Sequence, residues 1–167
     1  MPRLAVVLSM LLASPATAQG WETFDHDLGA GAAVCPYDDA DTGEFFCFAF
    51  ACLPGAEGQL MFRVAIQGPE IAQEAPPLSV HVDGKTVGMM FMPLLEHTEM
   101  YDFGKPYDPA RDASLLAALR AGSRAMLIFG IGPDAKIYPV SLSGSQAAID
   151  KVPELCGAAP LDLPEPD

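Results

Sequence analysis

The chain contains 167 residues, with 22 acidic and 9 basic side chains and a formal net charge of −13. Nucleic acids and anionic membranes bind proteins through basic side chains, so this acidity argues against both as partners. Its length suits a single domain preceded by a short leader.

Residues 1–18 are typical of a secretory signal peptide. Arg3 precedes an apolar run over residues 4–13, and the segment Ala16-Thr17-Ala18 supplies the small residues of a cleavage site. The run is too short for a transmembrane helix, which needs about twenty apolar residues. We therefore expect cleavage after Ala18 and a periplasmic or secreted protein without a membrane span; a retained N-terminal anchor is the alternative.

The following domain, residues 19–157, is expected to begin with antiparallel strands. Apolar and aromatic residues mark the segments WETF, GAGAAVCPY, GEFFCFAFACL and QLMFRVAI, and glycine and proline separate them. A β-hairpin is predicted for LSVHVDGKTVGMMFM, where Asp83-Gly84 lies between two apolar stretches.

Four cysteines, Cys35, Cys47, Cys52 and Cys156, predict two disulfides in an exported protein. A strand that includes Cys47 and Cys52 holds them about 16 Å apart, whereas a disulfide needs Cα atoms about 5.5 Å apart. A turn around Asp41 places Cys35 opposite Cys47, which favours the pairs Cys35–Cys47 and Cys52–Cys156. The pairs Cys35–Cys52 and Cys47–Cys156 stay open as an alternative.

The second half of the chain begins with a predicted helix. DPARDASLLAALRAG has Asp108 as a capping residue, a proline in the first turn and Gly122 just beyond the end. RAMLIFGI and KIYPVSL predict two further strands, and Pro139 places the second at a sheet edge or a bulge.

A second helix and an acidic tail complete the chain. SGSQAAIDKV predicts a short helix with Ser143 and Gln146 as a capping box and Pro153 at its end. Residues 158–167 are acidic and rich in proline, so we expect them to be disordered. Together these segments predict a disulfide-stapled, mainly β domain with two short helices, arranged as an antiparallel β-sandwich or open barrel.

The C-terminal third, LLAALRAGSRAMLIFG…KIYPVSLSGSQAAIDKV, resembles the invasion-associated locus B family, whose members are small exported proteins of Gram-negative bacteria. The similar features are the helix ending in a Leu-x-x-Gly turn, the following strand, the SLxGxxxAI segment, the VHVDG hairpin and the tryptophan near the mature N-terminus. The resemblance implies a periplasmic or secreted β-rich protein without established catalytic residues. It also implies, in places, a link to host-cell invasion, which we do not carry over.

The acidic segment YDDADTGE, residues 37–44, has three interpretations: a catalytic site, a Ca²⁺ site or a solvated turn. Asp41-Thr42-Gly43 matches the aspartic-protease tripeptide, but that chemistry needs two buried aspartates that share a proton. Clustered carboxylates also suit Ca²⁺, although the spacing of an EF-hand loop is missing. A solvated turn is the favoured interpretation.

Motifs for other catalytic chemistry are missing from the sequence. There is no Gly-x-Ser-x-Gly and no Cys-x-x-Cys, and Glu96-His97 is only a fragment of the zinc motif His-Glu-x-x-His. We therefore predict no cofactor and expect a non-enzymatic exported domain that binds an envelope protein or a small ligand.

The methionine-rich segment VGMMFMPLLEHTEM, residues 87–100, suggests the alternative of a periplasmic Cu(I)-binding accessory protein. Thioether and imidazole groups favour Cu(I), and Met90, Met92, His97 and Met100 are the candidate ligands. Methionine also fills irregular gaps in protein cores. The favoured interpretation is a core strand with one face against the opposite sheet and the other under a helix.

Overall fold

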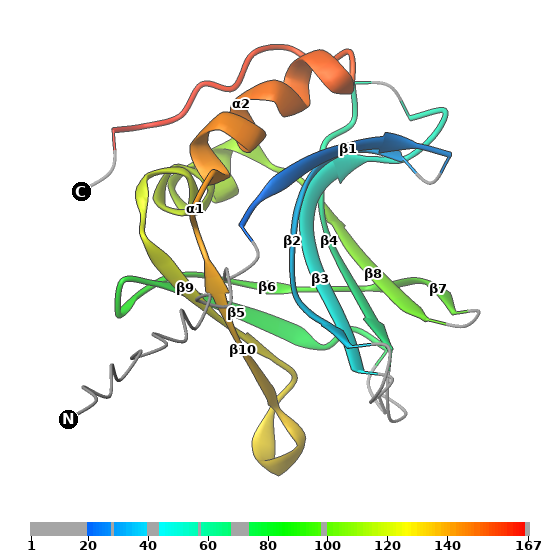
Figure 1. Cartoon of the computed structure of the whole chain (residues 1–167), viewed down its shortest axis with the longest axis vertical. Helices are drawn as coiled ribbons and strands as arrows, with labels where there is room; N and C mark the ends of the chain where they lie inside the picture. The colour runs from blue at the N-terminus through cyan, green and yellow to red at the C-terminus, as the bar shows by residue number, and fades with distance from the viewer. Residues whose placement is uncertain are drawn as a thin grey trace, which may run out of the picture.

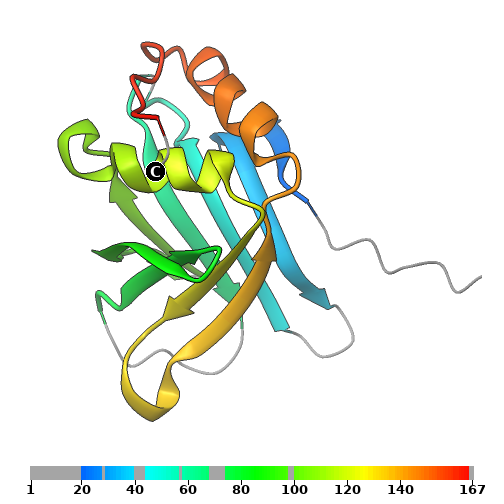
Figure 2. The same cartoon turned by 90° about the vertical axis from the view of Figure 1, so that its left-hand side faces the viewer.

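A computed structural model describes residues 20–27, 29–39, 44–56, 58–67, 74–97 and 100–165. Two antiparallel sheets and two α-helices make up this part of the chain (Figure 1). The prediction of a mainly β, disulfide-stapled fold is therefore confirmed. Both views place the helices at the same end of the molecule (Figure 1, Figure 2). Among the described residues, no helix is long and apolar enough to cross a membrane.

The larger sheet has six strands in the order β1-β2-β3-β4-β8-β7. They are β1 (Glu22–His26), β2 (Gly29–Asp39), β3 (Glu44–Cys52), β4 (Met61–Gln67), β8 (Tyr101–Pro106) and β7 (Leu94–His97). Successive side chains of a strand point to opposite faces. In β3, Phe46, Phe48 and Phe50 are fully buried in the core, whereas Cys47 and Ala49 lie on the outer face.

The smaller sheet has four strands in the order β10-β9-β5-β6. They are β10 (Lys136–Ser141), β9 (Arg124–Phe129), β5 (Pro77–Val82) and β6 (Lys85–Phe91). Strands β5 and β6 form the predicted hairpin around Asp83-Gly84. Aromatic rings join the two sheets, because Tyr138 of β10 stacks on Phe46 with 3.6 Å between ring centroids and Phe129 of β9 meets Phe103 of β8 at 5.1 Å.

Helix α1 (Pro109–Ala121) begins where the sequence predicts. The side chain of Asp108 accepts a hydrogen bond from the backbone N–H of Ala110 at 3.1 Å. The carboxylate of Asp112 accepts one from the backbone N–H of Asp108 at 2.9 Å and also pairs with Lys105. These bonds satisfy N–H groups that a helix leaves unpaired at its start. The helix packs against β5 and β6.

Helix α2 (Ser145–Leu155) differs from the prediction at both ends. Its N-cap residue is Gly144, which has a φ of 80° and no side-chain bond, so the capping box with Ser143 is wrong. The expectation that Pro153 ends the helix is also wrong, since the helix continues for two more residues. Proline costs the helix one hydrogen bond, but the disulfide at Cys156 ties this end of the helix to the sheet.

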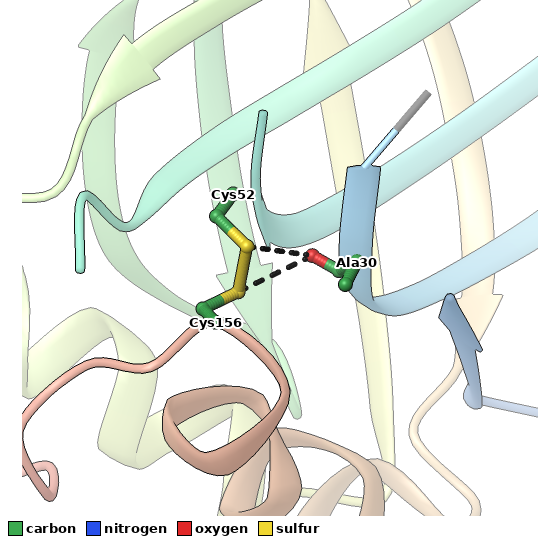
Figure 3. Close-up of a disulfide and its surroundings, with 3 residues drawn as sticks. All are labelled: Ala30, Cys52 and Cys156. Carbon is green, nitrogen blue, oxygen red and sulfur yellow. Dashed lines mark hydrogen bonds between the residues drawn. A yellow bond between two sulfur atoms is a disulfide. The ribbon is translucent and has the colours of Figure 1, made fainter. Parts of the chain in front are cut away.

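Two disulfides, Cys35–Cys47 and Cys52–Cys156, confirm the favoured pairing. Cys47 and Cys52 cannot join each other because both lie in β3. The sulfurs of Cys52 and Cys156 lie 3.5 and 3.4 Å from the carbonyl oxygen of Ala30 (Figure 3). A disulfide has no S–H to donate, so these are S···O contacts. This bridge spans 104 residues, and closing so long a loop stabilises the fold by about 4–5 kcal/mol in the chain-entropy model.

Strands β7 and β8 were not predicted from the sequence, whereas the edge position of Pro139 in β10 is confirmed. The residues from 158 to 165 form no helix or strand. Within this part of the predicted tail, Ala158, Leu161 and Leu163 are partly buried against the core. The predicted signal peptide, residues 1–18, lies outside the described residues, and so does the cleavage site.

Candidate binding groove

The outer face of the six-stranded sheet contains a groove with a volume of about 550 Å³. All six strands contribute to its lining, from β1 at one edge of the sheet to β7 at the other. Figure 1 shows these two edge strands on opposite sides of the curved sheet. The groove therefore crosses the sheet, on the face that points away from the helices and the core.

Small side chains form the floor of the groove. Ala33 of β2 lies directly opposite Ala49 of β3, and Cys47 of β3 lies opposite Ala65 of β4. Cross-strand neighbours of this kind have Cβ atoms about 5 Å apart, so bulky residues at these positions would fill the space. The hollow is thus a direct consequence of the alternation between large inward and small outward side chains.

The disulfide Cys35–Cys47 is part of this floor. The register between β2 and β3 shifts between Val34 and Tyr37, so an extra residue of β2 is accommodated there. The shift brings Cys35 opposite Cys47, with Cα atoms 4.1 Å apart, and both residues stay partly exposed. Besides joining the strands, the bridge gives the groove an apolar, polarisable surface.

Aromatic and thioether groups provide larger apolar surfaces at the sides. Phe24 and His26 of β1 stack with 5.0 Å between ring centroids. Phe45 of β3 and Met100, which precedes β8, also line the groove. Ligand sites in proteins are mostly apolar with a few polar groups, and their volumes are about 300–1,000 Å³. The groove agrees with this description in size and in character.

The charged residues of the groove are mainly acidic. Arg63 of β4 and Asp102 of β8 form an ion pair with 2.5 Å between Nη2 and Oδ2, and both side chains are largely buried. Glu22 lies on the β1 side and Glu96 on the β7 side. Since Arg63 is already paired with a carboxylate, the remaining carboxylates at the two edges favour a ligand that carries positive charge.

The methionine-rich segment does not contribute to the groove as one unit. Met90 and Met92 are 4% and 0% exposed and belong to the core, whereas His97 is exposed on β7, stacked on Tyr101 at 3.9 Å. Only Met100 lines the groove. Binding of one ion by Met90, Met92, His97 and Met100 together requires the core to open. The Cu(I) site stays a prediction from the sequence.

The expected core strand is correct for one of its faces only. Met89 and Phe91 alternate with the buried methionines in β6 and are 68% and 62% exposed. The strand is at the edge of the smaller sheet, and α1 covers the same inner side as the core. The prediction that both faces are buried is therefore wrong, because no element covers the outer side among the described residues.

The middle of the acidic segment YDDADTGE, residues 40–43, lies outside the described residues, and these include Asp41, Thr42 and Gly43. The protease and Ca²⁺ interpretations of that segment therefore stay untested. In the part of the chain that is described, no three His, Cys, Asp or Glu side chains gather in a way that suits a metal ion.

Sequence reasoning did not identify the groove. Its residues come from six strands, and no short motif contains them. The available signal was the small residues at alternate positions, as in Cys47 and Ala49 between the phenylalanines of β3. Alternation of large and small apolar residues predicts which face is hollow only after the strand order is known.

Comparisons with known proteins found no matching family model, no matching curated protein and no matching solved structure. The resemblance to the invasion-associated locus B family therefore remains a prediction from the residues of the C-terminal third.

Proposed function

We propose that this protein is a non-enzymatic binding domain of the bacterial cell envelope, and that it holds an apolar, positively charged ligand in the groove of the six-stranded sheet. The observation that carries the proposal is the hollow of about 550 Å³ over a floor of alanines and a disulfide. The two disulfides are compatible with an oxidising compartment.

Shape supports an elongated apolar ligand. The floor consists of alanines and a disulfide, whose side chains are short in every conformation. The depth of the groove therefore does not depend on a side chain moving aside. Burial of each CH₂ group of a ligand in such a site is favourable by about 0.8 kcal/mol. An alkyl or aromatic group that follows the floor across the strands therefore has enough surface for measurable binding.

Charge supports a cation at one or both ends of that ligand. Glu22, Glu96 and Asp102 oppose a single arginine in the groove, and Asp102 is occupied by Arg63. The ring of Phe24 adds an aromatic face, which also attracts cations. Among the described residues that line the groove, an anionic ligand of the same length meets the carboxylates of Glu22 and Glu96 and no unpaired guanidinium.

Three probes with the same ten-carbon chain test the proposal: decyltrimethylammonium, decyl maltoside and decyl sulfate, each below its micelle concentration. Isothermal titration calorimetry should give the tightest binding for the cation and the weakest for the anion. Ala65→Leu, which fills the floor, should weaken binding of the cation at least tenfold, equivalent to about 1.4 kcal/mol. Ala147→Leu on the exposed side of α2 is the matched control.

Glu22→Gln with Glu96→Gln tests the charge separately. Exposed ion pairs contribute about 0.2–1 kcal/mol each, so the double variant should bind the cation about twofold to thirtyfold more weakly and the neutral probe unchanged. Glu154→Gln on α2 removes a carboxylate outside the groove and should change neither. Binding of all three probes that is indifferent to Ala65→Leu would show that the groove is not the site.

A further inference from the structure

The outer face of the four-stranded sheet is apolar and exposed. Met89, Phe91, Met126, Ile128, Ile137 and Pro139 lie on it, and we call this surface the flat face. The exposed fractions are 68% for Met89, 62% for Phe91, 58% for Ile137 and 45% for Met126. In the register of β9 and β10, Met126 lies opposite Pro139 and Ile128 opposite Ile137, so these four side chains are contiguous. On β5, Ser79 lies between Ile128 and Met89, and His81 lies between Met126 and Thr86.

Carboxylates avoid the flat face. The outward positions of β5, β6, β9 and β10 carry no Asp or Glu, although the chain has 22 acidic residues. Arg124 and His81 are the basic residues there, and the ring of His81 contacts the hydroxyls of Ser79 and Thr86 at 3.1 and 3.0 Å. The carboxylate of Asp83, in the β5–β6 turn at the rim, accepts hydrogen bonds from the backbone N–H groups of residues 123 and 124.

The area of the flat face suits a modest interface. Four strands spaced about 4.8 Å apart and about six residues long, at about 3.3 Å each, give a sheet of roughly 19 by 20 Å. Two such faces have a flat area of about 760 Å². The relief of the protruding side chains raises the accessible area that they bury toward about 1,200 Å², the lower limit for specific protein interfaces. Exposed apolar patches of several hundred Å² on a monomer are typical of interaction sites.

We propose that two copies of this chain associate through their flat faces to form a symmetric dimer, independently of any ligand in the groove. Copies with a net charge of −13 repel each other, and this face allows contact without burying carboxylates against carboxylates. A twofold axis places the same apolar patch on both sides, as most homodimers do. The four-stranded sheets of the two copies then pack face to face, about 10 Å apart.

Sedimentation velocity on the purified, oxidised protein tests the dimer between about 1 and 200 μM, a range that covers micromolar affinities. The mass should rise from that of one chain toward twice that value. Added salt should strengthen the association, because screening reduces the repulsion between the two acidic copies. Met126→Asp should keep the protein monomeric over the whole range, because it places two carboxylates at the centre of the interface.

Met100→Asp is the matched control, since Met100 is also a partly exposed methionine but lies outside the flat face. It should dimerise like the unaltered chain. Ile137→Lys provides a second disruptive variant if Met126→Asp does not fold, as judged by circular dichroism. A single-chain mass at every concentration, or an assembly that Met126→Asp and Ile137→Lys both leave intact, would overturn the proposal.

Discussion

The outer faces of the two sheets differ in relief and in charge. On the six-stranded sheet, alanines and a disulfide leave a hollow whose edges carry Glu22 and Glu96. On the four-stranded sheet, apolar side chains such as Met89, Phe91 and Met126 dominate the surface with Ser79 and His81 between them, and its four described strands carry no carboxylate. Both faces belong to similar antiparallel sheets, so side-chain size at alternate positions, more than the backbone, decides which kind of partner each face suits.

The inner faces of the two sheets explain why their outer faces can differ without loss of stability. The core between the sheets contains fully buried residues such as Phe48, Phe62, Leu78 and Leu127, and neither outer face is needed to complete it. Burial of such side chains contributes about 1.5–3 kcal/mol each. The outer positions are therefore available for binding, and we expect substitutions there to affect binding more than stability.

The largest expected effect on stability separates two methionines of the same segment. Met92→Ala removes a fully buried side chain and should lower the free energy of unfolding by about 2–5 kcal/mol. Met89→Ala, at a position 68% exposed on the flat face, should change it by less than about 0.5 kcal/mol. Urea unfolding at low protein concentration, followed by the fluorescence of the single tryptophan, Trp21, measures both.

Equal losses for the two variants would contradict the assignment of an inner and an outer side to this segment. Trp21 is a suitable reporter because it is 5% exposed and its ring meets the edge of Phe48 in the core at 6.0 Å.

The smallest expected effect concerns Tyr107, the residue before the N-cap of α1. Burial, helped by the carboxylates of Asp112, Asp108 and Asp162, raises the pKa of Tyr107. The folded protein thus holds this proton more tightly than the unfolded chain, whose tyrosines titrate near pH 10. The stabilisation is fully present below about pH 10 and is lost as the pH rises through the pKa of the folded state.

Tyr107→Phe should therefore flatten the loss of stability above about pH 10, because phenylalanine cannot titrate. Urea midpoints measured from pH 8 to pH 11 compare the two proteins. The same alkaline slope in both would show that neither burial nor the nearby carboxylates raise the pKa of Tyr107 in the folded protein.

Local features of the fold were predictable from the sequence, whereas features built from distant segments were not. Asp108 marks the start of α1, Asp83-Gly84 marks a hairpin, and the length of β3 excludes a bridge between Cys47 and Cys52. Each of these depends on residues close together in the chain. The pairing of Cys52 with Cys156 was favoured because a turn around Asp41 places Cys35 opposite Cys47, while the alternative pairing stayed open, and the structure decides between the two.

Strands β7 and β8 were missed because their residues, LLEH and YDFGKP, show no clear alternation of apolar and polar side chains. They form strands because β8 pairs with the edge of β4, and β7 pairs with the other edge of β8. The groove was missed for a related reason, since Glu22 and Glu96 come from opposite edges of one sheet. Sheet order brings such residues to the same surface, and the sequence does not specify that order locally.

Mapping of the cationic probe by NMR tests the assignment of the groove as the ligand site most directly. Amide chemical shifts of the ¹⁵N-labelled protein would be followed during titration with decyltrimethylammonium. We expect the largest changes at Ala33, Ala49 and Ala65 on the groove floor, with Met126 on the flat face unchanged. Changes concentrated on the flat face, with the three alanines unaffected, would contradict the assignment and show that the apolar surface of the smaller sheet is the binding site.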